Sequence, residues 1–138
     1  MDFDFWRLRA SSYHPAMNPM TFEDLESWQR ARISVRKIYE LTRSARLCRD
    51  FGICNQIQRA SVSVMSNIAE GFERTHLPEK IQFYNVARGS IAEVRSLLYV
   101  VEDNFANVAP AAKKLRDEII TVGKLVSGLL RSTRQRTS

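Results

Sequence analysis

The chain has 138 residues, of which 44% are hydrophobic and 26% are charged, and its formal net charge is +6. This length and composition suit one globular domain with its own hydrophobic core. Glycine and proline are scarce, at five and four residues, which disfavours a turn-rich β fold and favours long helices. No apolar stretch is long enough to span a bilayer and the N-terminus lacks a secretory pattern, so a cytoplasmic protein is expected.

The sequence offers little that resembles an active site. Cys48 and Cys54 are the only cysteines and belong to no Cys/His cluster, so no metal site and no cofactor is expected. Glu73 and His76 have the E-x-x-H spacing of di-iron bundles, but those proteins need two such motifs. Glycine-rich phosphate loops and nucleophile motifs are also missing. We therefore expect no catalytic residues and a protein that is not an enzyme.

The first segments in chain order are a tail and a helix. Residues 1–20 show no helical period, which predicts an N-terminal tail. Thr21 and Asp24 resemble a capping box, and the first helix is expected over residues 22–48. Its apolar residues alternate in steps of three and four, which keeps them on one face: Trp28, Ala31, Val35, Ile38, Thr42 and Ala45.

A second helix is expected over residues 54–74, and it is apolar on an unusually wide arc. Two adjacent stripes together cover roughly 200° of its circumference: Ile57, Ala60, Val64 and Ile68, and beside them Val62, Met65, Ala69 and Phe72. Such a helix must be covered from two sides. It is either the central helix of its own bundle or part of a subunit interface.

Two further helices complete the pattern, at residues 78–105 and 110–131. Pro78 and Pro110 suit the first turns of these helices. Gly89 lies inside the third helix, where it either permits close approach of another helix or is a tolerated weakness. Residues 132–138 read as a basic C-terminal tail. Because the connections are short, residues 21–131 are predicted to form an all-α, antiparallel up-down-up-down four-helix bundle.

The positive charge suggests a candidate binding surface. Four arginines of the first helix fall within about 80° of arc and are candidate nucleic-acid contacts: Arg32, Arg36, Arg43 and Arg46. A surface of this kind attracts polyanions through its long-range field. The alternative is a basic face that does no more than keep the protein in solution.

Two motifs carry a resemblance to a known family. Residues 56–71 fit the pattern Q-x-x-R-A-x-x-S-x-x-x-N-I-A-E-G, and residues 87–93 fit A-x-G-S-x-x-E. The chain thereby resembles the bacterial four helix bundle protein family, also called the 23S rRNA intervening-sequence protein family. The polar and glycine positions of this signature are Gln56, Arg59, Ser63, Asn67, Glu70, Gly71, Gly89, Ser90 and Glu93.

The resemblance implies a ring-like homopentamer of antiparallel bundles. Distant relatives bind RNA and a reverse transcriptase, while the family as a whole has no assigned activity. The leading hypothesis is therefore an oligomeric, non-enzymatic protein that binds nucleic acid, and RNA in particular, through its basic surface. The alternative is a protein–protein adaptor or scaffold with no nucleic-acid role.

The sequence also suggests two local features of the second helix. Asn67 and Glu70 lie on a polar ridge between apolar surfaces and are expected to hydrogen-bond to a neighbouring helix or subunit, with Arg59 as one candidate partner of Glu70. A solvated ridge is the alternative. Cys54 stands where family members often carry a capping threonine, which predicts a frayed start of this helix.

Overall fold

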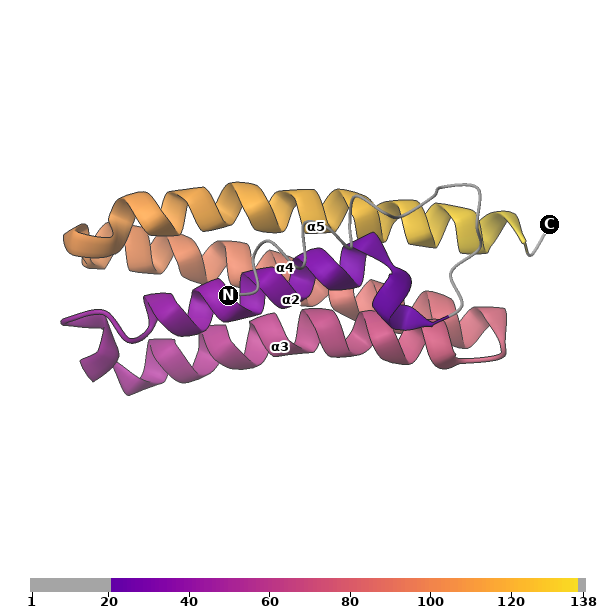
Figure 1. Cartoon of the computed structure of the whole chain (residues 1–138), viewed down its shortest axis with the longest axis horizontal. Helices are drawn as coiled ribbons and strands as arrows, with labels where there is room; N and C mark the ends of the chain where they lie inside the picture. The colour runs from indigo at the N-terminus through magenta and orange to yellow at the C-terminus, as the bar shows by residue number, and fades with distance from the viewer. Residues whose placement is uncertain (1–20, 137–138) are drawn as a thin grey trace.

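The structure, a computed structural model, describes residues 21–136, which form four long helices (Figure 1). In chain order these are α2 (Glu26–Leu41), α3 (Phe51–Glu73), α4 (Leu77–Asn104) and α5 (Ala109–Gln135). Three short 3-10 helices lie in the connections: η1 (Phe22–Asp24), η2 (Leu47–Arg49) and η3 (Ala106–Val108). The predicted tail at residues 1–20 and the last two residues lie outside the described part of the chain.

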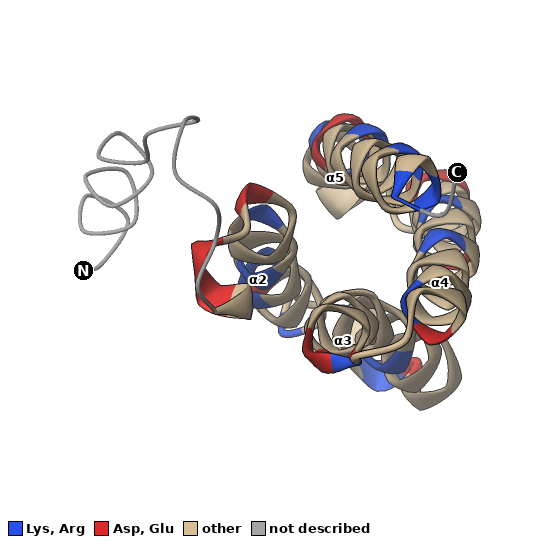
Figure 2. Cartoon of the chain, turned by 90° about the vertical axis from the view of Figure 1, so that its right-hand side faces the viewer, with Lys and Arg blue, Asp and Glu red and all other residues tan. Residues whose placement is uncertain are grey.

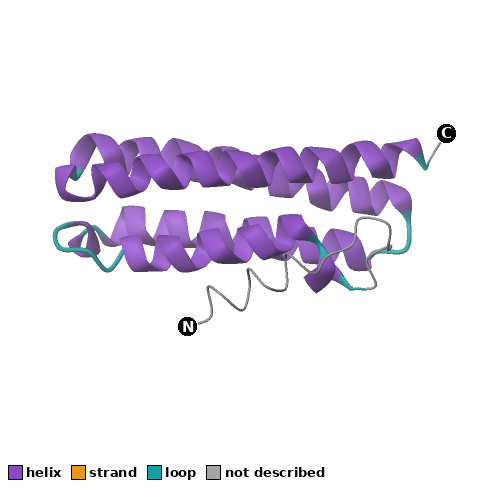
Figure 3. Ribbon diagram, turned by 45° about the horizontal axis from the view of Figure 1, so that its top comes forward, coloured by secondary structure: helices purple, strands orange, loops and turns teal. Residues whose placement is uncertain are grey.

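Each helix packs against the next along the chain, and α2 also contacts α5, which closes the bundle. Figure 3 shows the short loops that join the helices, and no strand occurs in residues 21–136. The predicted all-α, up-down-up-down four-helix bundle is confirmed. No helix within the same residues has the length and the apolar content to cross a membrane.

The hydrophobic core follows the predicted apolar stripes. The largest fully buried side chains are supplied by all four long helices and by η2: Ile38, Leu47, Ile57, Ile68, Leu98, Ile119 and Leu130. On α3, the first apolar stripe faces the core, while Met65, Ala69 and Phe72 of the second stripe are partly buried against it. α3 is therefore covered by neighbouring helices of its own bundle on two flanks, although Val62 remains 39% exposed.

The first helix is much shorter than the predicted range of 22–48. The capping box of Thr21 and Asp24 is present, but it caps η1, and α2 begins only at Glu26. At the other end, Thr42 Oγ1 donates to the carbonyl of Tyr39 at 2.9 Å, and Ser44 Oγ donates to that of Leu41 at 2.7 Å. Such bonds from side chain to backbone compete with continuation of a helix, and the chain turns although no glycine or proline is present.

The second helix begins earlier than the predicted residue 54, and its start is capped rather than frayed. Asp50 is the N-cap, and its Oδ1 accepts the backbone N–H of Ile53 at 3.1 Å. Gly52 is thus inside the first turn of α3. Cys54 is buried one turn into the helix, with its thiol donating to the carbonyl of Leu47 at 3.2 Å. The frayed start expected from Cys54 is wrong because the Asp50 carboxylate accepts the amide of Ile53 and caps the helix.

The fourth helix continues beyond the predicted end at residue 131. α5 extends to Gln135, and Thr133 is buried, with its hydroxyl donating to the carbonyl of Leu129 at 2.7 Å. Residues 132–135 of the predicted basic tail therefore belong to the bundle. The remaining helix, α4, agrees with its predicted range to within one residue at each end, with Pro78 in its first turn.

Candidate nucleic-acid interface

The four arginines predicted to share one helix face are divided by the end of α2. Arg32 and Arg36 are exposed on α2, whereas Arg43 and Arg46 lie beyond Leu41 in the turn that leads to α3. The guanidinium of Arg32 lies over the ring of Trp28, with its carbon 5.7 Å from the ring centroid. A continuous stripe of four arginines on one helix is therefore wrong, because the turn carries two of them to the end of the bundle.

Acidic residues neutralise other cations on α2. Arg30 pairs with Glu26 at 3.1 Å, and Lys37 pairs with Glu118 of α5 at 2.7 Å. Figure 2, which views the bundle along its length, shows positively charged segments on each of the four helices and acidic segments among them. α2 as a whole thus has a mixed charge rather than a purely positive one.

A more concentrated basic surface lies between α4 and α5. An open groove there is lined by four cationic side chains, Arg88 and Arg95 from α4 and Lys124 and Arg131 from α5. The other lining residues are small or apolar and include no acid: Ile91, Ala92, Ile120, Gly123 and Ser127. All four cations are exposed to solvent. We call these four side chains and their lining the α4–α5 groove.

The four cations of the α4–α5 groove form two pairs, one on each helix, and both pairs have the same spacing in the sequence. Arg88 and Arg95 are seven residues apart, as are Lys124 and Arg131, and two helical turns bring such residues back to the same face, about 10 Å further along. A Cβ added to Gly123 would lie 3.5 Å from Ile91 Cγ2, so the two helices approach closely beneath the groove. The seven-residue spacing can be read from the sequence. The sequence does not show that the two pairs line one groove, because this depends on the packing of α4 against α5.

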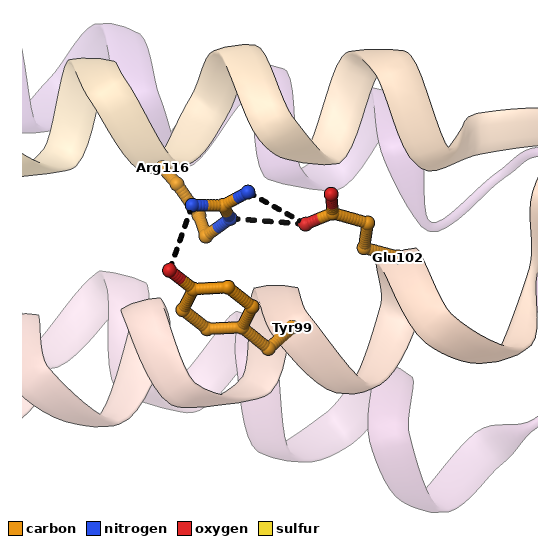
Figure 4. Close-up of polar contacts among 3 residues, drawn as sticks. All are labelled: Tyr99, Glu102 and Arg116. Atoms are coloured by element: carbon orange, nitrogen blue, oxygen red, sulfur yellow. Dashed lines mark hydrogen bonds and ion pairs between the residues drawn. The ribbon is translucent and has the colours of Figure 1, made fainter.

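Arg116 on the same pair of helices has a structural role instead. Its guanidinium donates to Glu102 Oε2 at 2.7 and 3.1 Å and to the hydroxyl of Tyr99 at 2.9 Å (Figure 4). It also lies over the Tyr99 ring, 4.0 Å from the centroid. This cation is neutralised and largely covered, so it contributes little field to the groove.

Three polar signature residues form a hydrogen-bonded cluster between α3 and α4. The hydroxyls of Ser63 and Ser90 lie 2.8 Å apart across the two helices. Asn67 Nδ2 donates to Ser63 Oγ at 3.0 Å and to the Ser63 carbonyl at 2.8 Å. The polar ridge is therefore connected to a neighbouring helix through Ser63, while Asn67 itself bonds within α3. We call these three residues the serine–asparagine cluster.

Gly71 lies where α4 side chains pack tightly against the backbone of α3. A Cβ there would lie 2.6 Å from Tyr84 Cε1 and 3.1 Å from Phe83 Cβ, so only glycine fits. Beside it, Lys80 Nζ donates to the carbonyls of Gly71 at 3.3 Å and Phe72 at 2.6 Å, which satisfies the end of α3. The glycine of the N-I-A-E-G motif thus has a packing role.

The other signature positions are on the surface. Gln56, Arg59 and Glu70 of α3 are exposed, as are Gly89 and Glu93 of α4. Arg59 and Glu70 are eleven residues apart on one helix, about 16 Å along its axis, and form no ion pair within the described chain. The expected pairing of these two residues is therefore not present within one chain.

The titratable groups that burial perturbs all belong to helix packing. Burial raises the pKa of the Cys54 thiol and lowers that of Lys80. Burial also raises the pKa of Tyr84 to about 12. None of these groups lines the α4–α5 groove, and within residues 21–136 no three metal-binding side chains gather. The α4–α5 groove presents arginine and lysine side chains, which can hold an anion by electrostatics and hydrogen bonding.

Comparison with known proteins identifies the family. The sequence model of the family described as 23S rRNA-intervening sequence protein matches residues 23–128. The chain belongs to this family. The match includes all of α2, α3 and α4 and most of α5. No curated protein matches the sequence.

Proposed function

We propose that this member of the intervening-sequence protein family binds nucleic acid, with RNA as its preferred partner, through the α4–α5 groove. The observation that carries the proposal is the set of four exposed cations around one groove that no acid lines. Arginine forks suit bidentate contact with phosphate oxygens. The family description names an intervening sequence of 23S rRNA, and for this reason we propose RNA ahead of DNA.

The dimensions of the groove suit the backbone of a strand better than a small anion. The two cations on each helix are separated by about 10 Å. Over that distance, one strand of a duplex presents about three phosphates. A strand lying along the groove can therefore contact cations from both helices, whereas a single phosphate can contact only the cations nearest to it.

The test is a binding titration with a matched pair of variants. Labelled RNA and DNA are titrated with the protein at low salt, and binding is read by fluorescence anisotropy. The double variant R95Q/K124Q should lower affinity by about tenfold, because it removes charged contacts to phosphate. R32Q/R36Q, which removes the same charge from α2, should change affinity by less than about threefold. Equal losses, or no binding by the unaltered protein, would disprove the role of the groove.

We also propose that the protein associates with itself, as a homopentamer by resemblance to its family, through the outer face of α4. Val86, Gly89, Glu93 and Val100 recur in steps of three, four and seven and so lie on one exposed face. Val86 is 47% exposed and Val100 42% exposed. A Cβ on Gly89 would meet nothing within 4 Å, which leaves room for another helix to approach closely.

Sedimentation velocity tests this second proposal. The unaltered protein should sediment as an oligomer, and V86E/V100E should sediment as a folded monomer because burying two carboxylates is costly. S132E, at an exposed position of α5, is the control and should leave the mass of the oligomer unchanged. A monomeric unaltered protein would contradict self-association and would favour the adaptor role, with the α4 face binding a different protein.

A further inference from the structure

The turn between α2 and α3 forms a basic and aromatic end of the bundle. Arg43, Arg46 and Arg49 are exposed there. Phe51, the first residue of α3, is 75% exposed, the highest value among the large hydrophobic residues that the structure describes. This end also includes the connection from α4 to α5 (Figure 1). We call Arg43, Arg46, Arg49 and Phe51 the tip.

The backbone at the tip is strained and firmly held. Arg46 has φ 70° and ψ −57°, and it is the one non-glycine residue with positive φ in residues 21–136. The amide of Leu47 donates to the carbonyl of Ala45 at 2.8 Å, so Arg46 is the central residue of a γ-turn of the rare, strained type. Strain of this kind persists only where the surroundings enforce it, and it gathers at functional sites.

Contacts on both sides of Arg46 enforce the turn. Leu47 is buried at 1% exposure, and its carbonyl accepts the thiol of Cys54. Asn107, from the connection between α4 and α5, donates to the carbonyl of Ala45 at 3.0 Å. The Arg46 side chain itself is exposed and takes no part in core packing. These contacts hold the strained turn in place, and the turn exposes the side chain of Arg46 to solvent.

Phe51 is exposed without a role in the core. It follows the N-cap Asp50, whose carboxylate is engaged by the amide of Ile53. Hydrophobic core residues begin two positions later, at Ile53. A polar residue at position 51 would serve the first turn of α3 almost equally well, since three quarters of the Phe51 surface is exposed. An exposed phenyl ring at the same end of the bundle as three exposed arginines therefore suggests a ligand that is both anionic and aromatic.

We propose that the tip binds an unpaired nucleotide, with the base stacked on the Phe51 ring and the adjoining phosphates held by the tip arginines. This inference rests on the proposed nucleic-acid function and adds to it a preference for unpaired over paired nucleotides. Every base has a flat face that can stack on an aromatic side chain. In a duplex those faces are already stacked, so only loops, bulges and single strands offer them. The α4–α5 groove, by contrast, contacts backbone whether or not the bases are paired.

The composition of the tip favours nucleic acid over a membrane surface. Helices that lie on membranes bury a broad apolar face together with their cations. Here the apolar part is a single ring, because the neighbouring positions from 43 to 50 are polar or small except for the buried Leu47. The tip therefore lacks the broad apolar face of a membrane-binding helix, while its ring can stack on a base and its arginines can contact phosphates.

The experiment compares a single-stranded RNA with a duplex RNA of the same length, using the full chain. F51A should lower affinity for the single strand by about tenfold, the loss expected for one stacked base, and change affinity for the duplex by less than about twofold. F51W, which keeps an aromatic ring at position 51, should retain the preference of the unaltered protein for the single strand. V62A, which truncates another exposed apolar side chain on α3, is the matched control and should affect neither ligand.

The outcomes separate this inference from the proposed function. If F51A lowers affinity for both ligands equally or for neither, the tip does not bind an unpaired base, while backbone binding by the groove stands. If the unaltered protein binds neither RNA, the proposed function fails and this inference fails with it. Loss of binding to vesicles of anionic lipid by F51A, with RNA binding unchanged, would assign the tip to a membrane surface instead. Thermal melting monitored by circular dichroism verifies that each variant is folded.

Discussion

At the scale of single residues, two glycines of the family signature, Gly71 in α3 and Gly89 in α4, have opposite surroundings. Gly71 is buried against Tyr84 and Phe83, so α3 and α4 approach each other closely only because position 71 has no side chain. Gly89 is exposed and has an open space where a Cβ would be. The sequence alone left the reason for Gly89 undecided, because a helical wheel does not show how near the neighbouring helix lies.

Replacing each glycine by alanine tests this contrast. G71A should lower the free energy of unfolding by about 1–3 kcal/mol, because the added methyl group must displace the buried Tyr84 ring. G89A should raise the stability of the isolated chain by up to about 1 kcal/mol through helix propensity. Urea denaturation of both variants measures the difference. A G71A variant as stable as the unaltered protein would show that the two helices are not in close contact there.

Tyr84 also makes stability depend on pH. Its folded-state pKa is raised to about 12 by burial, above the about 10 of an unfolded tyrosine. The neutral phenol is thus favoured in the fold, and its contribution is fully present below pH 10 and is lost as pH rises toward 12. The total loss should be about 2–3 kcal/mol.

The Y84F variant supplies the control for this titration, because phenylalanine keeps the ring beside Gly71 and removes the ionisable hydroxyl. Chemical denaturation of both proteins between pH 9 and 12 gives the difference in stability as a function of pH. That difference should be flat up to about pH 10 and then fall. Parallel curves for the two proteins would show that Tyr84 ionises in the folded state as it does in water.

At the scale of elements, the bounds of a helix were predicted well only where the sequence marks them. α4 was predicted almost to the residue, because Pro78 marks its start and its apolar spacing is unbroken. α2 was predicted too long, because Thr42 and Ala45 continue the apolar spacing while the helix is ended by side-chain bonds from Thr42 and Ser44. The γ-turn at Arg46 gives no sequence signal either, since it depends on Asn107 from a distant loop.

The serine–asparagine cluster and Glu70 make different contributions to the pairing of α3 with α4. N67A should lower the free energy of unfolding by about 1 kcal/mol, because it removes two hydrogen bonds to Ser63 in a partly buried site. E70A should change the stability of the isolated chain by less than about 0.5 kcal/mol, because Glu70 is exposed. Denaturation at concentrations where the chain is monomeric measures both values. A larger effect of E70A would contradict this assignment.

At the scale of the whole molecule, the bundle could be predicted from its four apolar repeats, but its basic surfaces could not. The sequence placed four arginines on one helix, whereas the structure divides them between the α2 face and the tip. The α4–α5 groove combines residues from two helices that are far apart in sequence, so it appears only once those helices are paired. The net charge suggested nucleic acid as a partner to consider, whereas the position of each basic surface depends on the tertiary structure.

The salt dependence of RNA binding tests the central claim most directly. For the unaltered protein, the logarithm of the association constant should fall linearly with the logarithm of salt concentration, because phosphate contacts release counterions. Replacing all four groove cations, as R88Q/R95Q/K124Q/R131Q, should make this slope shallower by about 3, which is the value for four lost phosphate contacts. An unchanged slope in the variant would contradict the account, since it would mean that the α4–α5 groove contacts no phosphate.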